Sequence, residues 1–185
     1  MKKGVFKAIL ALGFLIFSAL LLRVGSQYSG VCPLSQGQLS GGSSYEDVLI
    51  TRVIDGDTLQ MENRKRLRLI GIDTPEMHES NKLQRDAQRT KQDAEIIKTM
   101  GRKAYEFTRK LVEGKRVRLE FDVEKNDKYS RLLAYVYLKD GTFVNAEIVK
   151  QGYASLMTFV PNVKYAELFK EFYKEARENK RGLWK

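Results

Sequence analysis

Hydrophobic and polar residues alternate over several short segments between Glu46 and Leu138, which is the pattern of half-buried β-strands. Asp-Gly, Asn-Arg and Thr-Pro pairs separate these segments and are interpreted as turns or strand ends. The alternation therefore predicts five strands, at residues 48–54, 57–62, 65–72, 117–121 and 132–138.

The second and third strands are predicted to form a hairpin around Asn63-Arg64. A two-residue turn at this place would put Glu62 opposite Lys65 and Asp57 opposite Ile70. In that register Arg68 is a diagonal neighbour of Asp57 on one face of the hairpin. A slip of one residue would turn the side chains to the other face.

Helical spacing of apolar residues predicts a helix over 94–113, a short helix over 145–150 and a final helix over 164–179. Residues 77–92 are polar and charged without a period, and we interpret them as a loop. Five short antiparallel strands with about three helices between and after them favour an α+β fold. The architecture expected from this pattern is a five-stranded β-barrel of the OB-fold type.

The first 45 residues differ in composition from the rest of the chain. Basic residues in 1–7 precede an uncharged apolar run of 15 residues, 8–22, which is shorter than the ~20 residues of a usual membrane span. We interpret residues 1–26 as a signal peptide or membrane anchor and the Gly/Ser-rich residues 27–45 as a flexible linker. The folded domain is then 46–185, and we expect it to be exported. It would be secreted or held at the outer face of the cytoplasmic membrane through residues 8–22.

The composition of the chain excludes two kinds of covalent or metal site. A single Cys excludes an internal disulfide, and one Cys with one His is too few for a zinc site. The net charge is +10; four basic residues and no acidic one lie in 1–26, which leaves 29 basic and 23 acidic residues and a net charge of +6. This charge favours a polyanionic partner, although a solvated basic surface would have the same composition.

Acidic residues follow two of the predicted strands, as Asp55 and Asp57 in one case and Asp73 and Glu76 in the other. The hairpin brings both groups to the same open end, where like charges repel unless a cation neutralises them. Oxygen ligands without His or Cys indicate a hard ion, Ca²⁺ or Mg²⁺. Taken separately, each motif is also explained by ordinary turn chemistry.

A third group of polar residues, 127–131, precedes the last predicted strand. Arg131 has the planar fork that suits phosphate oxygens, and Tyr129 could stack on a base. A solvated charged loop is the alternative interpretation of this segment alone.

Together these motifs resemble the thermonuclease (staphylococcal or micrococcal nuclease-like) family, from about Val48 to Trp184. The resemblance rests on three segments and their order, at residues 54–58, 68–76 and 127–135, and on the closing Gly182-Leu183-Trp184. It implies an OB-fold barrel and a Ca²⁺-dependent endonuclease that hydrolyses DNA and RNA. It also implies metal-assisted attack of water that leaves 3′-phosphate ends, and we expect a monomer.

The resemblance assigns metal binding to the carboxylates of Asp57 and Asp73 and to the backbone carbonyl of Thr74. Asp55 corresponds to an acid that lies next to these ligands without being one of them. Glu76 corresponds to the residue that orients or deprotonates the attacking water.

For the substrate, the resemblance implies that Arg68 and Arg131 clamp the phosphate and that Lys128 and Tyr129 contact the nucleic acid. Ser130 departs from the family pattern, where the best-known relatives have Gly. The base-stacking aromatics of the family correspond only loosely to Tyr153 and Phe159 in this chain.

Two other functions remain compatible with parts of the sequence. One is a catalytically inactive OB-fold module that binds nucleic acid, although all the acids and arginines of the family site are present. The other is a membrane-surface protein whose basic face binds anionic lipid, which leaves the acidic residues without a role.

Overall fold

The structure, a computed structural model, describes residues 45–185. The predicted signal or anchor at 1–26 and the linker up to residue 44 lie outside the described residues. Tyr45, which the linker prediction included, contacts the barrel: its carbonyl accepts a hydrogen bond from the Leu119 N–H (2.8 Å), and its ring packs edge-on against Phe121.

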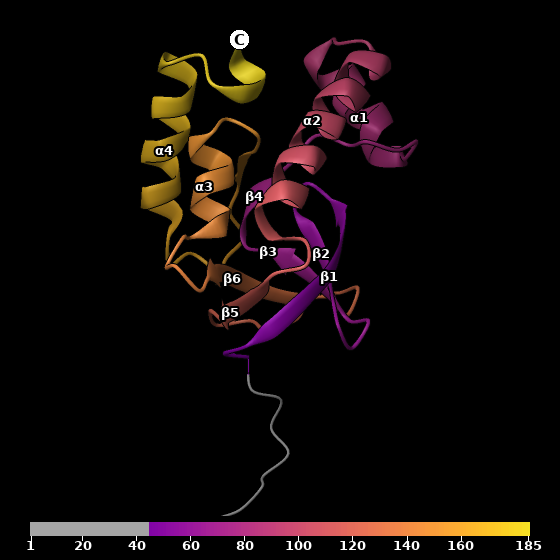
Figure 1. Ribbon diagram of the computed structural model, residues 1–185. Coiled ribbons are helices and arrows are strands. Elements are labelled where there is room, and N and C mark those ends of the chain that lie inside the picture. Colours follow the sequence, from indigo (N-terminus) through magenta and orange to yellow (C-terminus); the bar gives the residue numbers. More distant parts are fainter. Residues whose placement is uncertain (1–44) are drawn as a thin grey trace, which may run out of the picture. The chain divides into compact units, whose positions relative to one another are not determined.

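Five strands form a closed barrel (Figure 1). They are β1 (Val48–Asp55), β2 (Thr58–Met61), β3 (Arg66–Leu69), β5 (Arg116–Glu120) and β6 (Leu132–Leu138), paired in the order β1-β2-β3-β6-β5 with β5 also paired to β1. Alternate Leu, Ile, Val and Met side chains fill its interior, as in other small barrels. The predicted five-stranded OB-type barrel is therefore confirmed.

The apolar pattern of β1 contains a break that the structure explains. Ile50 and Val53 are both buried although three positions separate them, whereas strict alternation would bury every second residue. The pairing of β1 with β2 shifts register between Ile50 and Arg52, which marks a β-bulge. The bulge returns the following side chains to the interior and bends the strand around the barrel.

The parallel pairing of β3 with β6 corrects the prediction of an all-antiparallel barrel. Arg68 on β3 lies opposite Leu133 on β6, and the two strands run in the same direction. Arg131 directly precedes β6, so the parallel register places its backbone next to the start of β3, the strand that carries Arg68. Pairing between segments more than sixty residues apart follows from closure of the barrel, which no local pattern encodes.

The hairpin between β2 and β3 is shifted by one residue from the predicted register. Thr58 lies opposite Arg68, and the Met61 N–H donates to the Lys65 carbonyl (3.0 Å). The turn thus has three residues, and Arg64 in it adopts a left-handed conformation with a φ of 63°. A two-residue turn was the wrong assumption.

The predicted strand 65–72 is two strands. It breaks at Ile70, and Gly71, whose φ of 83° suits glycine, begins the next strand. A Cβ on Gly71 would lie 2.6 Å from the ring of Phe169. Beyond the break, β4 (Gly71–Asp73) leaves the barrel and pairs with β7 (Ser155–Met157), a strand that the pattern did not predict. The break turns Asp73 back towards β3.

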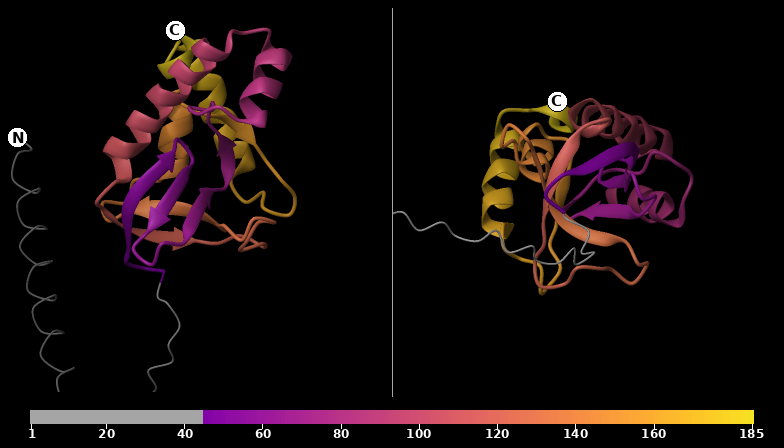
Figure 2. Two further views of the ribbon diagram at one scale, coloured as in Figure 1. Left: turned by 90° about the vertical axis from the view of Figure 1, so that its right-hand side faces the viewer. Right: turned by 60° about the horizontal axis from the view of Figure 1, so that its bottom comes forward.

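Four α-helices gather on one side of the barrel, as Figure 1 and the left view of Figure 2 show. They are α1 (Asn81–Thr90), α2 (Ala94–Val112), α3 (Val144–Lys150) and α4 (Ala166–Glu178), and a short 3₁₀ helix follows at Gly182–Trp184. The last three α-helices were predicted. None of the helices in residues 45–185 is both long and apolar enough to cross a membrane.

Helix α1 corrects the interpretation of residues 77–92 as a loop, and with it the expected number of helices. Ser80 caps its first turn by accepting a hydrogen bond from the Leu83 N–H (3.0 Å). Leu83 is fully buried and is the only buried residue of the helix. One apolar contact is too weak a signal for a helical period, so the segment looked like a loop in the sequence.

Asn145 on α3 fixes the place where β3 ends. Its side chain is fully buried, and its Oδ1 accepts a hydrogen bond from the Val136 N–H (3.0 Å). Its Nδ2 donates to the Ile70 carbonyl (3.0 Å), at the break between β3 and β4. The amide thus satisfies backbone groups that the diverging strands leave unpaired.

Candidate active site

Asp57 lies directly before β2 and is 3% exposed. Its Oδ2 accepts hydrogen bonds from the N–H (2.7 Å) and the hydroxyl (3.0 Å) of Thr74. Its carboxylate also forms an ion pair with Arg68. These contacts connect β2 to the end of β4 and hold both segments next to β3.

Gly56 and the neighbouring helix fix the turn that carries Asp57. A Cβ on Gly56 would lie 2.7 Å from the Thr74 side chain, so a larger residue would push Thr74 away from Asp57. The buried Thr108 of α2 donates its hydroxyl to the Gly56 carbonyl (2.7 Å). Asp55 accepts a hydrogen bond from the Asp57 N–H (3.1 Å), which places it next to the site as predicted from the resemblance.

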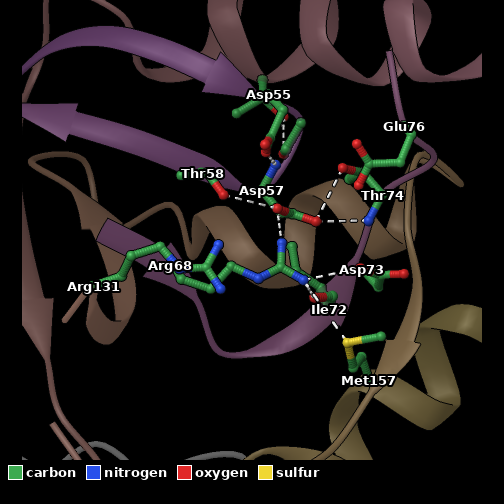
Figure 3. A network of polar contacts seen from close by, with 12 residues as sticks. Asp55, Asp57, Thr58, Arg68, Ile72, Asp73, Thr74, Glu76, Arg131 and Met157 are labelled. Atoms are coloured by element: carbon green, nitrogen blue, oxygen red, sulfur yellow. Dashed lines mark hydrogen bonds and ion pairs between the residues drawn. The ribbon is translucent and has the colours of Figure 1, made fainter. Parts of the chain in front are cut away.

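Arg68 is the centre of the polar network (Figure 3). Besides Asp57, its guanidinium contacts Oδ1 of Asp73 (2.9 Å) and the Ile72 carbonyl (3.1 Å), and its side chain is 13% exposed. Burial lowers the pKa of Arg68 below its ordinary value, while the carboxylates of Asp73 and Asp55 act in the opposite direction. One arginine therefore joins both carboxylates that the resemblance assigns to metal binding.

Glu76 follows β4 and lies close to α2 through its backbone. A Cβ on Gly101 of α2 would lie 2.5 Å from the Glu76 carbonyl oxygen and 2.7 Å from the Pro75 carbonyl oxygen. The absence of a side chain at Gly101 thus allows α2 to pack directly against the segment that carries Glu76. The helix therefore positions the backbone of Glu76.

We expect Gly101→Ala to lower the nuclease activity that the resemblance implies, up to about a hundredfold if Glu76 moves by about 1 Å. The added methyl group overlaps two backbone carbonyls that cannot rotate away, so the segment must shift. Steady-state cleavage rates, with thermal unfolding to show that the domain remains folded, check this. Thr99→Ala, at an exposed position of the same helix, is the control; equal rates for both variants would contradict the positioning role of Gly101.

A lysine from α1, which sequence reasoning did not assign to the site, reaches the same groups. The Lys82 ammonium lies 2.9 Å from Asp73 Oδ1, 3.1 Å from the Thr74 carbonyl oxygen and 3.0 Å from Glu76 Oε1. Burial alone would lower the pKa of Lys82, but the carboxylates of Asp73 and Glu76 outweigh it and raise this pKa. In the sequence, the one signal for helix α1 was Ser80 as its N-cap, which would have placed Lys82 in the first turn of a helix.

The contacts of Lys82 test whether the site suits a cation. Three oxygens from separate residues converge on one positively charged atom, and all are hard ligands of the kind that Ca²⁺ or Mg²⁺ takes. Within residues 45–185 no three His, Cys, Asp or Glu side chains lie close enough together to form a metal site by themselves. The oxygens of Asp73, Thr74 and Glu76 therefore suit a hard cation only because one of them, the Thr74 oxygen, is a backbone carbonyl.

Arg131 and its loop lie at the edge of this network (Figure 3). Asp127 holds the loop: its carboxylate accepts hydrogen bonds from the N–H groups of Tyr129 (2.9 Å) and Arg131 (3.0 Å) and pairs with the Arg131 Nε (2.7 Å). Burial would raise the pKa of Asp127, but these hydrogen bonds lower it below its usual range. The arginine is thus oriented by a carboxylate that stays ionised at neutral pH.

The predicted substrate contacts Lys128 and Tyr129 are both exposed, and the ring of Tyr129 lies under the cations of Lys128 and Arg131. Ser130 between them has a φ of 59°. That left-handed conformation favours glycine, so the serine occupies a position for which the family's Gly is better suited. The loop keeps its hydrogen bonds in spite of this substitution.

The two aromatics that the sequence left unassigned lie in different places. Tyr153 stacks on Phe107 of α2, with ring centroids 4.5 Å apart, and belongs to the packing between helix and loop. Phe159 is 69% exposed and lines a hollow of about 60 Å³ together with Arg68 and Met157. Of these two rings, Phe159 is therefore the one that lies beside the arginine network.

The fold is thus a closed OB-type barrel with a buried acid–arginine network directly before β2, and the guanidinium groups of this network suit a phosphate anion. Residues 66–185 match the family described as "Staphylococcal nuclease homologue". The chain is 39% identical over 142 residues to a thermonuclease of Staphylococcus intermedius, which covers 75% of this chain and 76% of the relative. It is 32% identical over 178 residues to a thermonuclease of Staphylococcus hyicus, which covers 93% and 95%.

The prophage-derived endonuclease YokF of Bacillus subtilis is 35% identical over 143 residues, which are 75% of this chain and 44% of that protein. The chain belongs to the staphylococcal nuclease family. It is a hydrolase of the nuclease class, as the resemblance in its motifs implied.

Proposed function

We propose that the protein is a Ca²⁺-dependent endonuclease that hydrolyses phosphodiester bonds of DNA and RNA and leaves 3′-phosphate ends. One observation carries this proposal. The Arg68 guanidinium contacts both Asp57 and Asp73, and the positive charge of Arg131 is near enough to help lower its pKa. Two guanidinium groups beside two carboxylates suit a substrate that is itself an anion and that a cation accompanies.

The carboxylates of Asp57 and Asp73 and the carbonyl of Thr74 are the groups that would hold Ca²⁺. When bound, the ion would supply Lewis-acid stabilisation of charge on the phosphate and a template for its oxygens. The convergence of Asp73 and Thr74 oxygens on the Lys82 ammonium supports this assignment.

The remaining steps are carried by side chains of the protein. Arg68 and Arg131 bind the non-bridging phosphate oxygens and stabilise the charge that grows on them in the transition state. Glu76 orients the attacking water and accepts its proton. The water oxygen forms a bond to phosphorus and the bond to the 5′ oxygen breaks. The 5′ oxygen leaves with the bonding electrons and takes up a proton from solvent, and the phosphate remains on the 3′ side. Lys128 and Tyr129 contact the strand next to the site.

Cleavage of plasmid DNA and of RNA, measured with Ca²⁺ and with a chelator, tests the proposal. We expect degradation of both polymers only with Ca²⁺, and products that a polymerase extends only after phosphatase has removed the 3′-phosphate. Binding of nucleic acid without cleavage under every metal condition would instead favour an inactive OB-fold module.

Export is proposed from the sequence alone, because a basic segment, an apolar run of 15 residues and a Gly/Ser-rich stretch precede the domain. Cell fractionation with amino-terminal sequencing tests it, and the intact chain in the cytosol would contradict it. We also propose that the enzyme acts as a monomer, which light scattering of the purified protein tests.

A further inference from the structure

The Lys82 ammonium lies where two of the three proposed metal ligands, Asp73 and the Thr74 carbonyl, converge with Glu76. Its ammonium contacts Asp73 Oδ1 at 2.9 Å, the Thr74 carbonyl at 3.1 Å and Glu76 Oε1 at 3.0 Å, and its side chain is 27% exposed. Two of these groups are proposed ligands of Ca²⁺, and the third is the proposed partner of the attacking water. No other lysine in the described part of the chain forms ion pairs with these carboxylates.

Helix α1 holds this lysine in place. Ser80 caps the first turn, Leu83 next to Lys82 is fully buried, and Asn81 begins the helix. The ammonium is therefore a tethered cation. Its effective concentration near the oxygens is high and does not depend on the salt concentration of the solution. Only its flexible four-carbon stem needs to change rotamer for the ammonium to leave.

Lys82 and a divalent ion cannot share these oxygens. Ca²⁺ requires oxygen ligands at about 2.3–2.6 Å, which would place it within bonding distance of the atoms that now surround the ammonium. Two positive centres at that separation also repel each other. Binding of the ion thus requires the loss of the Lys82 contacts.

We propose that Lys82 is a built-in competitor of the divalent cation: it neutralises the acids of the metal-free enzyme and sets the Ca²⁺ concentration at which the site becomes loaded. The inference rests on the proposed Ca²⁺-dependent function and adds the residue that regulates it. An ion of single charge on a flexible stem is displaced by Ca²⁺ at sufficient concentration, so the lysine raises the threshold without abolishing activity.

Thermodynamic linkage gives this competition two consequences. Removing the ammonium should strengthen Ca²⁺ binding, because the ion no longer has to displace it. The same change should weaken the metal-free fold, since Asp73 and Glu76 lose a partner. In saturating Ca²⁺ the loss of stability should disappear, because the lysine makes no contact with these acids in the loaded state.

The test compares Lys82→Met with Arg85→Met in the purified full-length chain. Methionine keeps the length and helix propensity of lysine and removes its charge. Arg85→Met removes the same charge from an exposed position of the same helix, so it controls for net charge. Calorimetric titration with Ca²⁺ measures affinity, and thermal unfolding is followed in chelator and in saturating Ca²⁺.

We expect Lys82→Met to bind Ca²⁺ about tenfold more tightly than the unmodified chain, and Arg85→Met to stay within about twofold. The melting temperature of Lys82→Met should fall in chelator and match the unmodified chain in saturating Ca²⁺. Equal Ca²⁺ affinity of the two variants, or an equal fall of the melting temperature in both conditions, would overturn the inference.

The test also separates this inference from the proposed function. If the unmodified chain binds Ca²⁺ and cleaves DNA while Lys82→Met binds no more tightly, only the role of Lys82 is wrong. If neither the unmodified chain nor Lys82→Met binds Ca²⁺, the proposed Ca²⁺-dependent function fails, and the inference fails with it.

Discussion

Replacing Glu76 with Gln is expected to lower the turnover number for DNA cleavage about 10²- to 10⁴-fold, the range typical for loss of a general base. The amide keeps the shape of the carboxylate but cannot accept the proton of the attacking water. The variant loses the ion pair with Lys82, but the backbone of Glu76 remains packed against Gly101, so the segment should keep its position. Single-turnover cleavage rates at saturating DNA measure the effect.

Glu79→Gln is the matched control for this prediction. Glu79 lies three residues further along the chain, its side chain is 69% exposed, and it pairs with Lys98. The same loss of charge at that position should leave turnover within about twofold, as is usual for an exposed group. A Glu76→Gln variant that cleaves as fast as this control would exclude Glu76 as the base.

Arg68→Met is expected to affect both catalysis and folding. Loss of one preorganised contact to the transition state lowers turnover about 10²- to 10³-fold. The variant also leaves the buried carboxylates of Asp57 and Asp73 without their shared guanidinium. Removing one partner from a buried ion pair costs about 3–5 kcal/mol of the free energy of unfolding. Cleavage rates and chemical denaturation measure the two effects separately.

Arg66→Met on the same strand serves as the control, because Arg66 is exposed and points away from the interior. Calcium should restore part of the stability of Arg68→Met if the ion replaces the guanidinium as counter-charge for the acids. A variant at Arg68 with unmodified turnover and unmodified stability would contradict the central place of this arginine in the network.

The pattern of apolar and polar residues predicted those helices and strands that a single stretch of sequence determines. The long helix α2 has several apolar residues at helical spacing and an Asp93 cap, so its expected range of 94–113 agrees with Ala94–Val112. The pattern failed where a single residue decides the geometry. Arg64 in a left-handed turn moved the hairpin register by one, and Gly71 divided one expected strand into two.

The sequence predicted which residues form the site, but not which of them contact one another. The resemblance named Asp57, Asp73 and Arg68, and these three lie in one network in the structure. The parallel pairing of β3 with β6 that brings Arg131 near them depends on closure of the barrel. Lys82 was missed because its helix, α1, has a single buried residue and therefore no apolar period in the sequence.

The most direct test of the account is a Ca²⁺ titration of DNA cleavage by the unmodified chain, Asp57→Asn and Arg131→Ala. Asp57 is proposed to hold the ion, so its variant should need more Ca²⁺ for half-maximal activity and cleave more slowly. Arg131 is proposed to act on the phosphate, so its variant should lose turnover with an unchanged Ca²⁺ midpoint. If both variants cleave at the unmodified rate with the same midpoint, the active site has been assigned to the wrong residues.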